Sequence, residues 1–429
     1  MRLRELETSE RELRLRMPFR FGVLTLESCR QIFVRVRAEI DGRDVPGVAS
    51  EVLLPKWFDK SPDKTEAENV DDLRRSISDA LPFYQAEAPT AYALHVPAAA
   101  RAAAASNPLV AGFGVALLDR ALLDALCRAR GLSFFEAIRR NLPGTFLRGF
   151  DMDGFLASLK PKVEIAARHT VGLLDPLTRD EIQRRPPDDL PCSLDEAIEA
   201  YGLRYFKIKI SGRIEADLAR LTRIAAVLDR LDGYQATLDG NEQYKDAEAV
   251  VELWDRLAAQ LPRLAASILF IEQPIARGVA RAVSVAALAK RRPVEIDESD
   301  DTADAFVWAR ELGYAGVSSK SCKGVYRSLL NRARVERWGA PHFMSAEDLV
   351  VQPGISLQQD LSLAAIIGCA HVERNGHHYV DGRAFATSDE LERRVKACPR
   401  LYRPDGRLEI RRGMIDLRDL DTAGFGSQA

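Results

Sequence analysis

The sequence of 429 residues predicts an α/β protein in which a (β/α)8 TIM barrel follows an N-terminal α+β capping domain. From about residue 162, short apolar strands alternate with amphipathic helices, which is typical of βαβ units and a parallel sheet. Ionisable residues recur at the strand ends, with steps of 30, 33, 25 and 23 residues along the series Lys209, Asp239, Glu272, Asp297 and Lys320. Each step holds one strand, one loop and one helix, so we expect the units to close into a barrel.

The first 140 residues are expected to form the capping domain. Apolar and polar residues alternate in segments 3–19 and 28–53 around turn signals such as DGRD, as in an antiparallel meander. A helical pattern then runs from about Asp71 into an alanine-rich tract at 96–108, and alanine is the best helix former. A second long helical pattern at 107–142 has Gly131 where a C-cap is expected. A sheet followed by helices is therefore the predicted order.

The predicted barrel domain spans residues 141–400. Seven strand candidates have an apolar body and a polar end, at 163–170, 205–210, 234–240, 268–274, 293–299, 315–321 and 342–348. Amphipathic patterns between them, such as 213–231, predict the outer helices. An open doubly wound sheet is the alternative, but the first strand is not followed by a glycine-rich phosphate loop. After the eighth strand, Asn375 and Gly376 predict a type I′ hairpin.

Composition bounds the partners of the protein. The 61 basic and 63 acidic residues give a formal net charge of -2, which does not favour nucleic acid or an anionic membrane as a partner. The start of the chain lacks the apolar core of a signal peptide, and no run approaches the length of a membrane span. Six scattered cysteines show no metal-like or disulfide-like spacing. We therefore expect a cytoplasmic protein with a small-molecule partner.

The strand ends predict a catalytic constellation. Parallel barrels gather the carboxyl ends of their strands at one mouth, where their catalytic residues lie. The carboxylates of Asp239, Glu272 and Asp297 follow three adjacent strands, and hard oxygen ligands of this kind suit magnesium or manganese. Lysines flank these acids: Lys207 and Lys209 on one side and Lys320 on the other. We expect the lysines to face each other across the mouth.

This arrangement suits removal of a proton from the carbon next to a carboxylate. Loss of that proton leaves an enediolate, whose charge a divalent cation would stabilise. A lysine acts as the base only if its pKa falls towards neutrality, and a second ammonium such as Lys207 beside Lys209 would lower it, together with burial and the metal charge. Taken singly, an acid at a strand end is common and a lysine there can simply reach water. Five consecutive strand ends with acids grouped between bases are poorly explained in that way.

The motifs KIKI, LDGNE, FIEQP, IDES and SKSCKG resemble those of the enolase superfamily, within the mandelate racemase and muconate lactonizing enzyme family. The likeness is greatest to the muconate lactonizing enzyme and dipeptide epimerase branch. It covers most of the chain and implies that the tail, residues 401–429, returns to the capping domain and supplies its last strands. It also implies a symmetric homo-oligomer.

The resemblance implies a role for each matching residue. The magnesium ligands would be Asp239, Glu272 and Asp297. Lys209 would be the base on the second strand with Lys207 as its pKa-lowering neighbour, and Lys320 the opposing acid or base on the sixth. Local support would come from three further residues: Asn241, Glu298 and Lys323.

Several features depart from the family pattern. The segment before the second strand is longer than usual and rich in proline and acids, as a lid or a packing insert would be. Val325 stands where a second glycine is common. The seventh strand ends in Glu347 and Asp348 rather than in a histidine, which favours the branch with two opposed lysines. Glu347 is expected either to bind substrate or water or to cap a helix.

Additional substrate contacts are predicted at lower priority. Two cap segments, MPFRFG with Arg20 and SEVLLPKWF with Lys56 and Trp57, resemble the family loops that close over substrate, and Arg20 would clamp an anionic group. They could instead be ordinary turns. His169 on the first strand and His377 after the eighth are candidates to reach the mouth. A packing role is the alternative for both histidines.

The predicted reaction is magnesium-dependent α-proton abstraction from a small carboxylate substrate, followed by racemisation, epimerisation or cycloisomerisation. Loss of a β-substituent, as in an acid-sugar dehydratase, is the alternative on the same site. A lysine Schiff-base aldolase would use Lys320 or Lys209 but would leave three clustered acids unexplained. A barrel that has lost its chemistry and acts as a binding protein is the alternative outside the enzymes.

Overall fold

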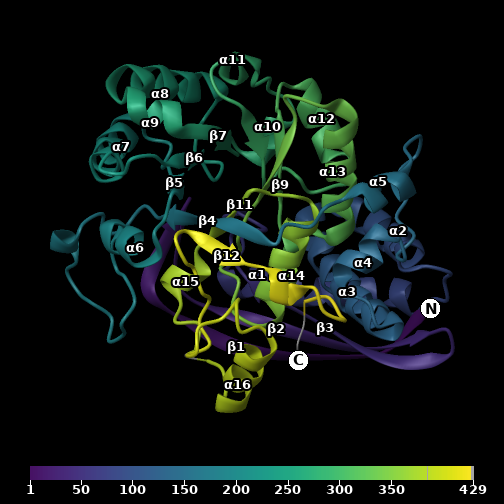
Figure 1. The fold of residues 1–429 in the computed structure, drawn as a ribbon. Helices are drawn as coiled ribbons and strands as arrows, with labels where there is room; N and C mark the ends of the chain where they lie inside the picture. Colours follow the sequence, from purple (N-terminus) through teal and green to yellow (C-terminus); the bar gives the residue numbers. More distant parts are fainter. Residues whose placement is uncertain (384, 427–429) are drawn as a thin grey trace.

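The computed structural model describes residues 1–383 and 385–426, which form an antiparallel three-stranded sheet with its helices and a parallel barrel (Figure 1). The order of the first sheet is β1-β2-β3. The barrel order is β10-β9-β8-β7-β6-β5-β4-β11, with parallel pairing throughout. The predicted fold class, a TIM barrel with an N-terminal α+β cap, is confirmed.

The cap begins with three long strands, β1 (Arg2–Phe21), β2 (Leu24–Ile40) and β3 (Arg43–Leu53). The helices that follow are α1 (Glu66–Gln85), α2 (Ala91–Ala103), α3 (Pro108–Arg130), α4 (Phe134–Arg139) and α5 (Met152–Ser158). The helical tract predicted from about Asp71 is thus two helices. Ala86 leaves the first one with an extended backbone, and the Thr90 side chain accepts from the backbone N–H of Ala93 to cap the second.

Helix α3 is bounded by local sequence signals. The Asn107 side chain caps its start, Pro108 follows in the first turn, and Gly131 ends it with a φ of 63°. The predicted C-cap at Gly131 is confirmed. The helix lies so close to β3 that a Cβ on Gly47 would stand 2.1 Å from the carbonyl oxygen of Ala121. Only glycine at position 47 allows this packing of sheet on helix.

The eight barrel strands are short. They are β4 (Glu164–Val171), β5 (Tyr205–Lys209), β6 (Gln235–Asp239), β7 (Ile268–Glu272), β8 (Val294–Ile296), β9 (Gly316–Ser319), β10 (Phe343–Ala346) and β11 (His371–Arg374). Six of the seven predicted strand segments contain one of these strands in full, and the segment 163–170 contains β4 except for its last residue, Val171. The eighth lies immediately before Asn375, as expected.

The helices that come after β4 lie between the barrel strands in the chain or follow the last of them. They are α6 (Leu194–Tyr201), α7 (Ile214–Leu228), α8 (Ala247–Gln260), α9 (Pro262–Ser267), α10 (Arg277–Ala280), α11 (Ala286–Ala289), α12 (Ala305–Glu311), α13 (Val325–Trp338), α14 (Ile355–Ile366), α15 (Gly376–Tyr379) and α16 (Ser388–Ala397). In Figure 1, α7 to α13 surround the upper strands, and α16 lies at the lower edge beside β1. Short 3-10 turns occur at Arg179–Glu181, Ser321–Lys323 and Arg418–Leu420.

The hairpin predicted at Asn375 and Gly376 was wrong, because the short helix α15 begins there. Asn375 has a φ of -127°, whereas a type I′ turn needs positive φ at both central residues. The backbone N–H groups of Asn375 and Gly376 both donate to the Asp348 carboxylate, at 2.8 and 3.3 Å. A tertiary contact from the preceding strand end therefore sets this turn.

The C-terminal strand β12 (Met414–Asp416) differs from the prediction. It pairs antiparallel with barrel strand β4, with Met414 opposite Ala166, rather than joining the cap sheet. The tail still reaches the cap helices, since the Phe425 ring stacks on Phe134 at 3.8 Å between centroids. The backbone N–H of Phe425 also donates to the carboxylate of Asp124, in α3.

The long segment between β4 and β5 packs against the cap and the C-terminal tail. Arg16 of β1 forms a bidentate pair with Asp188, at 2.7 Å for both bonds, and Arg407 of the tail bonds Asp189 at 2.7 Å. These contacts tie the segment to the cap and to the tail. Among the described residues, none of the helices has the length and apolarity needed to cross a membrane.

Candidate active site

Parallel register brings the predicted site residues to one end of the barrel. Lys209 is the register partner of Asp239, and Asp239 is the partner of Glu272, so these three lie side by side on β5, β6 and β7. Asp297 and Lys320 each stand one residue beyond the end of their strands, β8 and β9. The repeat spacing seen in the sequence thus corresponds to adjacent strand ends at the mouth.

One small cavity at this mouth is lined by both Lys209 and Lys320. The cap covers it with aromatic side chains. The Lys320 Nζ lies 4.3 Å from the centroid of the Trp57 ring, and the Lys209 Nζ lies 5.7 Å from that of Phe21. Glu373, at the end of β11, lines the same cavity. The structure therefore brings three predicted residues, Lys209, Lys320 and the cap residue Trp57, together with a carboxylate that was not predicted.

On the β5 side, two lysines share one aspartate. The Nζ of Lys209 lies 2.5 Å from Asp239 Oδ2, and that of Lys207 lies 3.0 Å from the same oxygen. Lys207 also contacts Glu272, Glu347 and Glu373 at 2.7, 2.7 and 2.9 Å. Burial alone would lower the pKa of Lys207, but these carboxylates raise it well above its usual value. Lys207 is therefore a fully buried ammonium inside the barrel.

On the β9 side, Lys320 and Lys323 both approach Asp297. The Lys320 Nζ lies 2.5 Å from Asp297 Oδ2, and the Lys323 Nζ lies 3.4 Å from Oδ1 and 3.1 Å from Asp300. Lys323 also donates to the carbonyl oxygen of Ser318 at 2.6 Å. Burial would lower the pKa of Lys320, but Asp297 raises it; burial would raise the pKa of Asp297, but the two lysines hold it far below its usual range.

The carboxylates gathered most tightly are not the predicted set of three. Among the described residues, oxygens of Glu272, Glu295 and Glu347 lie within 4.8 Å of one another. Asp239 and Asp297 stand outside this group because each is turned to lysines on its own side of the mouth. Of the predicted metal ligands, the structure therefore places only Glu272 in the tightest acidic group.

The donor chemistry around Glu272 fits a divalent cation. Burial, together with the negative charges of Asp239, Glu347 and Asp297, raises the pKa of Glu272 well above its usual value, although Lys207 opposes this. A further cation beside these acids would offset their mutual repulsion. Carboxylate oxygens are the ligands that magnesium and manganese take. Asp239, Glu272 and Asp297 are thus competent ligands by chemistry.

Asn241 and Glu298 support the Asp239 side of the mouth. The N–H of Asn241 donates to Asp239 Oδ1 at 2.8 Å, and its side-chain amide donates to Glu298 Oε1 at 3.3 Å. Two buried oxygens nearby, Asn241 Oδ1 and Glu298 Oε2, have no hydrogen-bond donor among the described residues. Lys60, from the cap, donates to the Asn241 carbonyl at 2.8 Å and to Glu298 at 3.3 Å. The cap thereby holds this corner of the site.

Several lower-priority candidates lie away from the mouth cavity. Arg20 is exposed on β1, where it pairs with Thr25. Lys56 donates to the carbonyl oxygens of Ser61 and Lys64 within its own loop. Glu347 is buried below the mouth, where it accepts from Ser345 at 2.5 Å and pairs with Lys207 and Arg168. It does not cap a helix.

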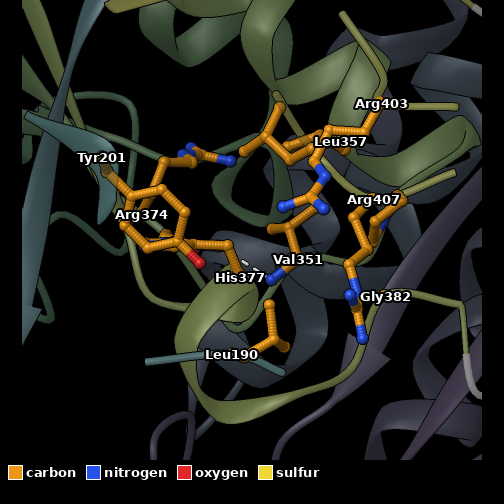
Figure 2. Close-up of a pocket in the computed structure, with 12 residues that line it drawn as sticks. Leu190, Tyr201, Val351, Leu357, Arg374, His377, Gly382, Arg403 and Arg407 are labelled. Atoms are coloured by element: carbon orange, nitrogen blue, oxygen red, sulfur yellow. Dashed lines mark hydrogen bonds between the residues drawn. The ribbon is translucent and has the colours of Figure 1, made fainter. Parts of the chain in front are cut away.

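His169, on the outward side of β4, lies beside His377 and His378 of α15. The ring nitrogens His169 Nδ1 and His377 Nε2 lie 3.3 Å apart, and the rings of His169 and His378 stand edge to face with centroids 4.8 Å apart. Burial lowers the pKa of His169 to about 3 and those of His377 and His378 well below their usual value. Figure 2 shows that His377 faces a separate small cavity with Tyr201 and Arg374. These histidines are not brought to the lysines.

The sequence reasoning missed three buried charged residues, Glu373, Arg168 and Glu295, and the half-buried Lys60. Glu373 stands at a strand end, as the detected acids do, and that signal was available in the stretch HVERNG. Arg168 and Glu295 lie on strand positions that point into the barrel, where they contact Glu347 and Ser345. Lys60 comes from a cap loop, and nothing in its local sequence predicts the contact with Asn241.

The family comparison matches residues 191–426 to the model described as enolase C-terminal domain-like. No curated protein sequence matches the chain. Among solved structures, dipeptide epimerase from Enterococcus faecalis with magnesium and a dipeptide is 15% identical over 99% of both chains, with a TM-score of 0.67. The 2-chloromuconate cycloisomerase from Rhodococcus opacus is 16% identical over 99% of this chain and 96% of that chain, with a TM-score of 0.68.

A third structure, an enolase from Bradyrhizobium with magnesium and mandelic acid, is 18% identical over 99% of this chain and 95% of that one, with a TM-score of 0.66. At such identities these likenesses show the shared fold. The family-model match covers more than half of the 429 residues and includes all the barrel strands from β5 to β11.

Proposed function

The chain belongs to the enolase superfamily and is an enzyme of its mandelate racemase and muconate lactonizing group, and from that premise we propose that it abstracts the α-proton of a small carboxylate substrate. One observation carries the proposal: Lys209 and Lys320 line the same cavity from opposite sides, each 2.5 Å from a different aspartate. Two bases at opposite sides of a substrate suit racemisation, epimerisation or cycloisomerisation.

In this proposal Lys209 takes the proton and Lys320 stands on the opposite face. Lys320 then returns a proton to that face, or remains an ammonium that stabilises negative charge on the substrate. Each lysine must turn from its aspartate to reach a substrate in the cavity. Lys207 shares Asp239 with Lys209, so Asp239 keeps an ammonium partner when Lys209 turns away.

Three carboxylates, Asp239, Glu272 and Asp297, would hold the magnesium or manganese ion. A bound divalent cation would supply Lewis-acid stabilisation of the enediolate charge. The raised pKa of Glu272, caused by burial and by its acidic neighbours, supports this assignment because a divalent cation would offset a repulsion that Lys207 only partly relieves. Asn241 and Glu298 orient the Asp239 side of the group through their mutual hydrogen bond.

The cap excludes water from the reacting groups. Trp57 and Phe21 place aromatic rings over Lys320 and Lys209, and Phe19 lines the same cavity. An apolar cover reduces the dielectric around the lysines and strengthens the electrostatic interactions beneath it. Glu373 lines the cavity, but its two oxygens already accept from Thr170 and Lys207, so it fixes the negative charge of this wall. The family resemblance implies a homo-oligomer, and a cytoplasmic location remains part of this proposal.

The test is α-proton exchange in D2O followed by proton NMR, with magnesium and a pooled panel of acid sugars, N-acylamino acids, dipeptides and lactone acids. We expect one α-proton signal to disappear, and its product separates epimerisation from cycloisomerisation and elimination. Glu272→Gln should lose both exchange and magnesium binding, measured by calorimetry. The matched control Glu248→Gln, an exposed site on α8, should keep both. Retained magnesium affinity in Glu272→Gln would overturn the ligand assignment.

A further inference from the structure

A second cavity, of about 260 Å³, lies between the cap sheet and the start of α14, away from the barrel mouth. Four arginines and one acid line it, namely Arg11, Arg35, Arg393, Arg394 and Glu390. Phe33 supplies an aromatic wall. The cavity shares no lining residue with the mouth cavity that contains the two lysines.

Arg394 of α16 is a buried charge without an ion pair. Arg394 is 7% exposed, and burial lowers the pKa of its guanidinium group. Its Nη1 donates to the carbonyl oxygens of Gly382 and Gly406 at 3.1 and 3.0 Å. Among the described residues, no carboxylate lies within ion-pair distance of it. Buried charges in proteins are normally paired, so this guanidinium calls for an anion.

The guanidinium of Arg394 faces the positive end of a helix. Gly354 is the N-cap of α14, a helix of 12 residues, and offers no side chain to bond the first N–H groups. A Cβ on Gly354 would stand 3.7 Å from Arg394 Nη2 and 3.9 Å from Nε. A cation beside a helix N-terminus is unfavourable, whereas an anion between them is attracted by both. An anion between Arg394 and the start of α14 would therefore interact favourably with both.

The remaining lining adds positive charge. Arg11 is paired with Glu390 at 2.7 Å, which leaves Arg35, Arg393 and Arg394 without a carboxylate partner among the described residues. Arg35 donates to the hydroxyl of Ser9 at 3.3 Å. Arg35 and Arg393 are exposed, so they add positive charge at the rim of the cavity, whereas Arg394 is buried. Guanidinium groups and helix N-termini together are the donors that recognise phosphate.

We propose that this cavity binds a phosphate group, either free or carried on a small phosphomonoester. The dianion balances the unpaired arginines, with Arg394 and the N–H groups at the start of α14 as its innermost contacts. Arg35 and Arg393 contact it from the rim. The cavity is larger than a phosphate ion needs, and Phe33 offers an apolar surface for an organic substituent. This binding site is independent of the proposed proton abstraction.

The experiment is calorimetric titration of the full chain with inorganic phosphate and, separately, with phenyl phosphate, in chloride buffer containing EDTA. We expect saturable binding at one site in both cases. Tighter binding of phenyl phosphate identifies the organic ester as the ligand, and equal or weaker binding identifies the free ion. Absence of saturable binding with both probes would overturn the proposal.

Two variants locate the binding. Arg394→Gln and Arg35→Gln should each weaken phosphate binding by about tenfold or more, as expected for loss of a charge-assisted hydrogen bond. Arg35 is exposed, so its variant retains the fold even if Arg394→Gln does not. Lys396→Gln is the matched control, because it removes an exposed charge from the same helix outside the cavity. Unchanged affinity in Arg35→Gln would contradict the site.

Discussion

The two sides of the barrel mouth use the same components in different ways. On the β5–β6 side, Lys207 and Lys209 share Asp239; on the β8–β9 side, Lys320 and Lys323 share Asp297. In each pair one lysine lines the mouth cavity, and the other is buried with its aspartate. Each aspartate thus retains one buried lysine when the other moves to a substrate.

The difference lies in the second lysine. Lys207 is in contact with carboxylates from four other strands, so it neutralises the interior of the barrel. Lys323 is held by the Ser318 carbonyl and hydroxyl groups and by Asp300, which follows the neighbouring strand β8. Similar sets of lysine and aspartate therefore have different roles. Lys207 neutralises acids from several strands, whereas Lys323 connects the ends of β8 and β9.

The largest expected effect is on catalysis, and it tests whether Lys209 and Lys320 have equivalent roles on the two sides of the mouth. Lys209→Ala and Lys320→Ala should each lower turnover of the acid identified by the exchange panel by about 10²–10⁴-fold, because each removes a base or acid. Stability should change little, since Asp239 keeps Lys207 and Asp297 keeps Lys323. Turnover and urea unfolding measure the two quantities.

If the two lysines serve opposite faces, each variant should still exchange the α-proton of one stereoisomer. Loss of exchange from both isomers in one variant alone would show that a single lysine does the chemistry. A variant that unfolds would instead indicate that the lysine serves the fold. The exposed Lys245→Ala on the barrel surface is a control for charge removal.

The next effect separates the buried lysines. Lys207→Met should lower the free energy of unfolding by about 3–5 kcal/mol, since it leaves several buried carboxylates without their cation. Lys323→Met should cost about 1–3 kcal/mol, because carbonyl and hydroxyl partners make up most of its contacts. Urea denaturation of both variants measures the difference. Equal losses would contradict the distinction between the two sides.

A pH effect tests how the cap loop is anchored to the β6 side. Arg277 donates to the carbonyl oxygens of Trp57 and Phe58 and pairs with Glu242, which also contacts Lys60. Although burial would raise the pKa of Glu242, Arg277 and Lys60 lower it to about 2 from 4.5. A lowered pKa stabilises the folded state above pH 4.5, and that stabilisation is lost as pH falls towards 2.

The shift corresponds to about 3 kcal/mol. Glu242→Gln should therefore be less stable than the wild type at pH 6, and the gap should narrow as the pH falls through 4 and 3. Urea unfolding across this range measures the gap. Glu248→Gln, exposed on α8, should differ from the wild type by the same small amount at each pH. A constant gap for Glu242→Gln would refute the linkage.

The smallest expected effect concerns the aromatic cover. Trp57→Leu removes a ring 4.3 Å from the Lys320 ammonium, an interaction of about 0.5–2 kcal/mol, so kcat/KM should fall by roughly two- to thirtyfold. Phe21→Leu should have a weaker effect, because its ring lies 5.7 Å from Lys209. Steady-state kinetics of the two variants gives the ratio. A larger loss in Phe21→Leu would reverse the expected order.

The barrel and its strand ends could be predicted because their signals are local and repeated. Lys209, Asp239 and Glu272 each close an apolar run, and parallel strands necessarily place such ends together. The turn at Asn375 was misjudged because Asp348, far away in the chain, binds its backbone. Glu373 was overlooked because its strand was interpreted as one arm of that hairpin.

The partners of each charge could not be predicted from spacing. Nothing in the sequence indicates that Lys207 meets four carboxylates, or that Lys60 of the cap reaches Asn241. Such contacts depend on rotamers and on how the cap sits over the barrel. His169 illustrates the same limit, because alternation along β4 leaves it outside while its neighbours Arg168 and Thr170 point inwards to Glu347 and Glu373.

The pairing of β12 with β4 has a consequence for biosynthesis. Strand β4 begins at Glu164, yet its antiparallel partner comes from residues 414–416, and Phe425 stacks on the cap residue Phe134 only after that. A nascent chain leaving the ribosome can form the cap helices early, but the segment that completes their contacts is synthesised only after the barrel strands. Neither domain is therefore complete before residues 414–425 have been synthesised, and deleting that segment would remove the antiparallel partner of β4 and the ring that stacks on Phe134 of α4.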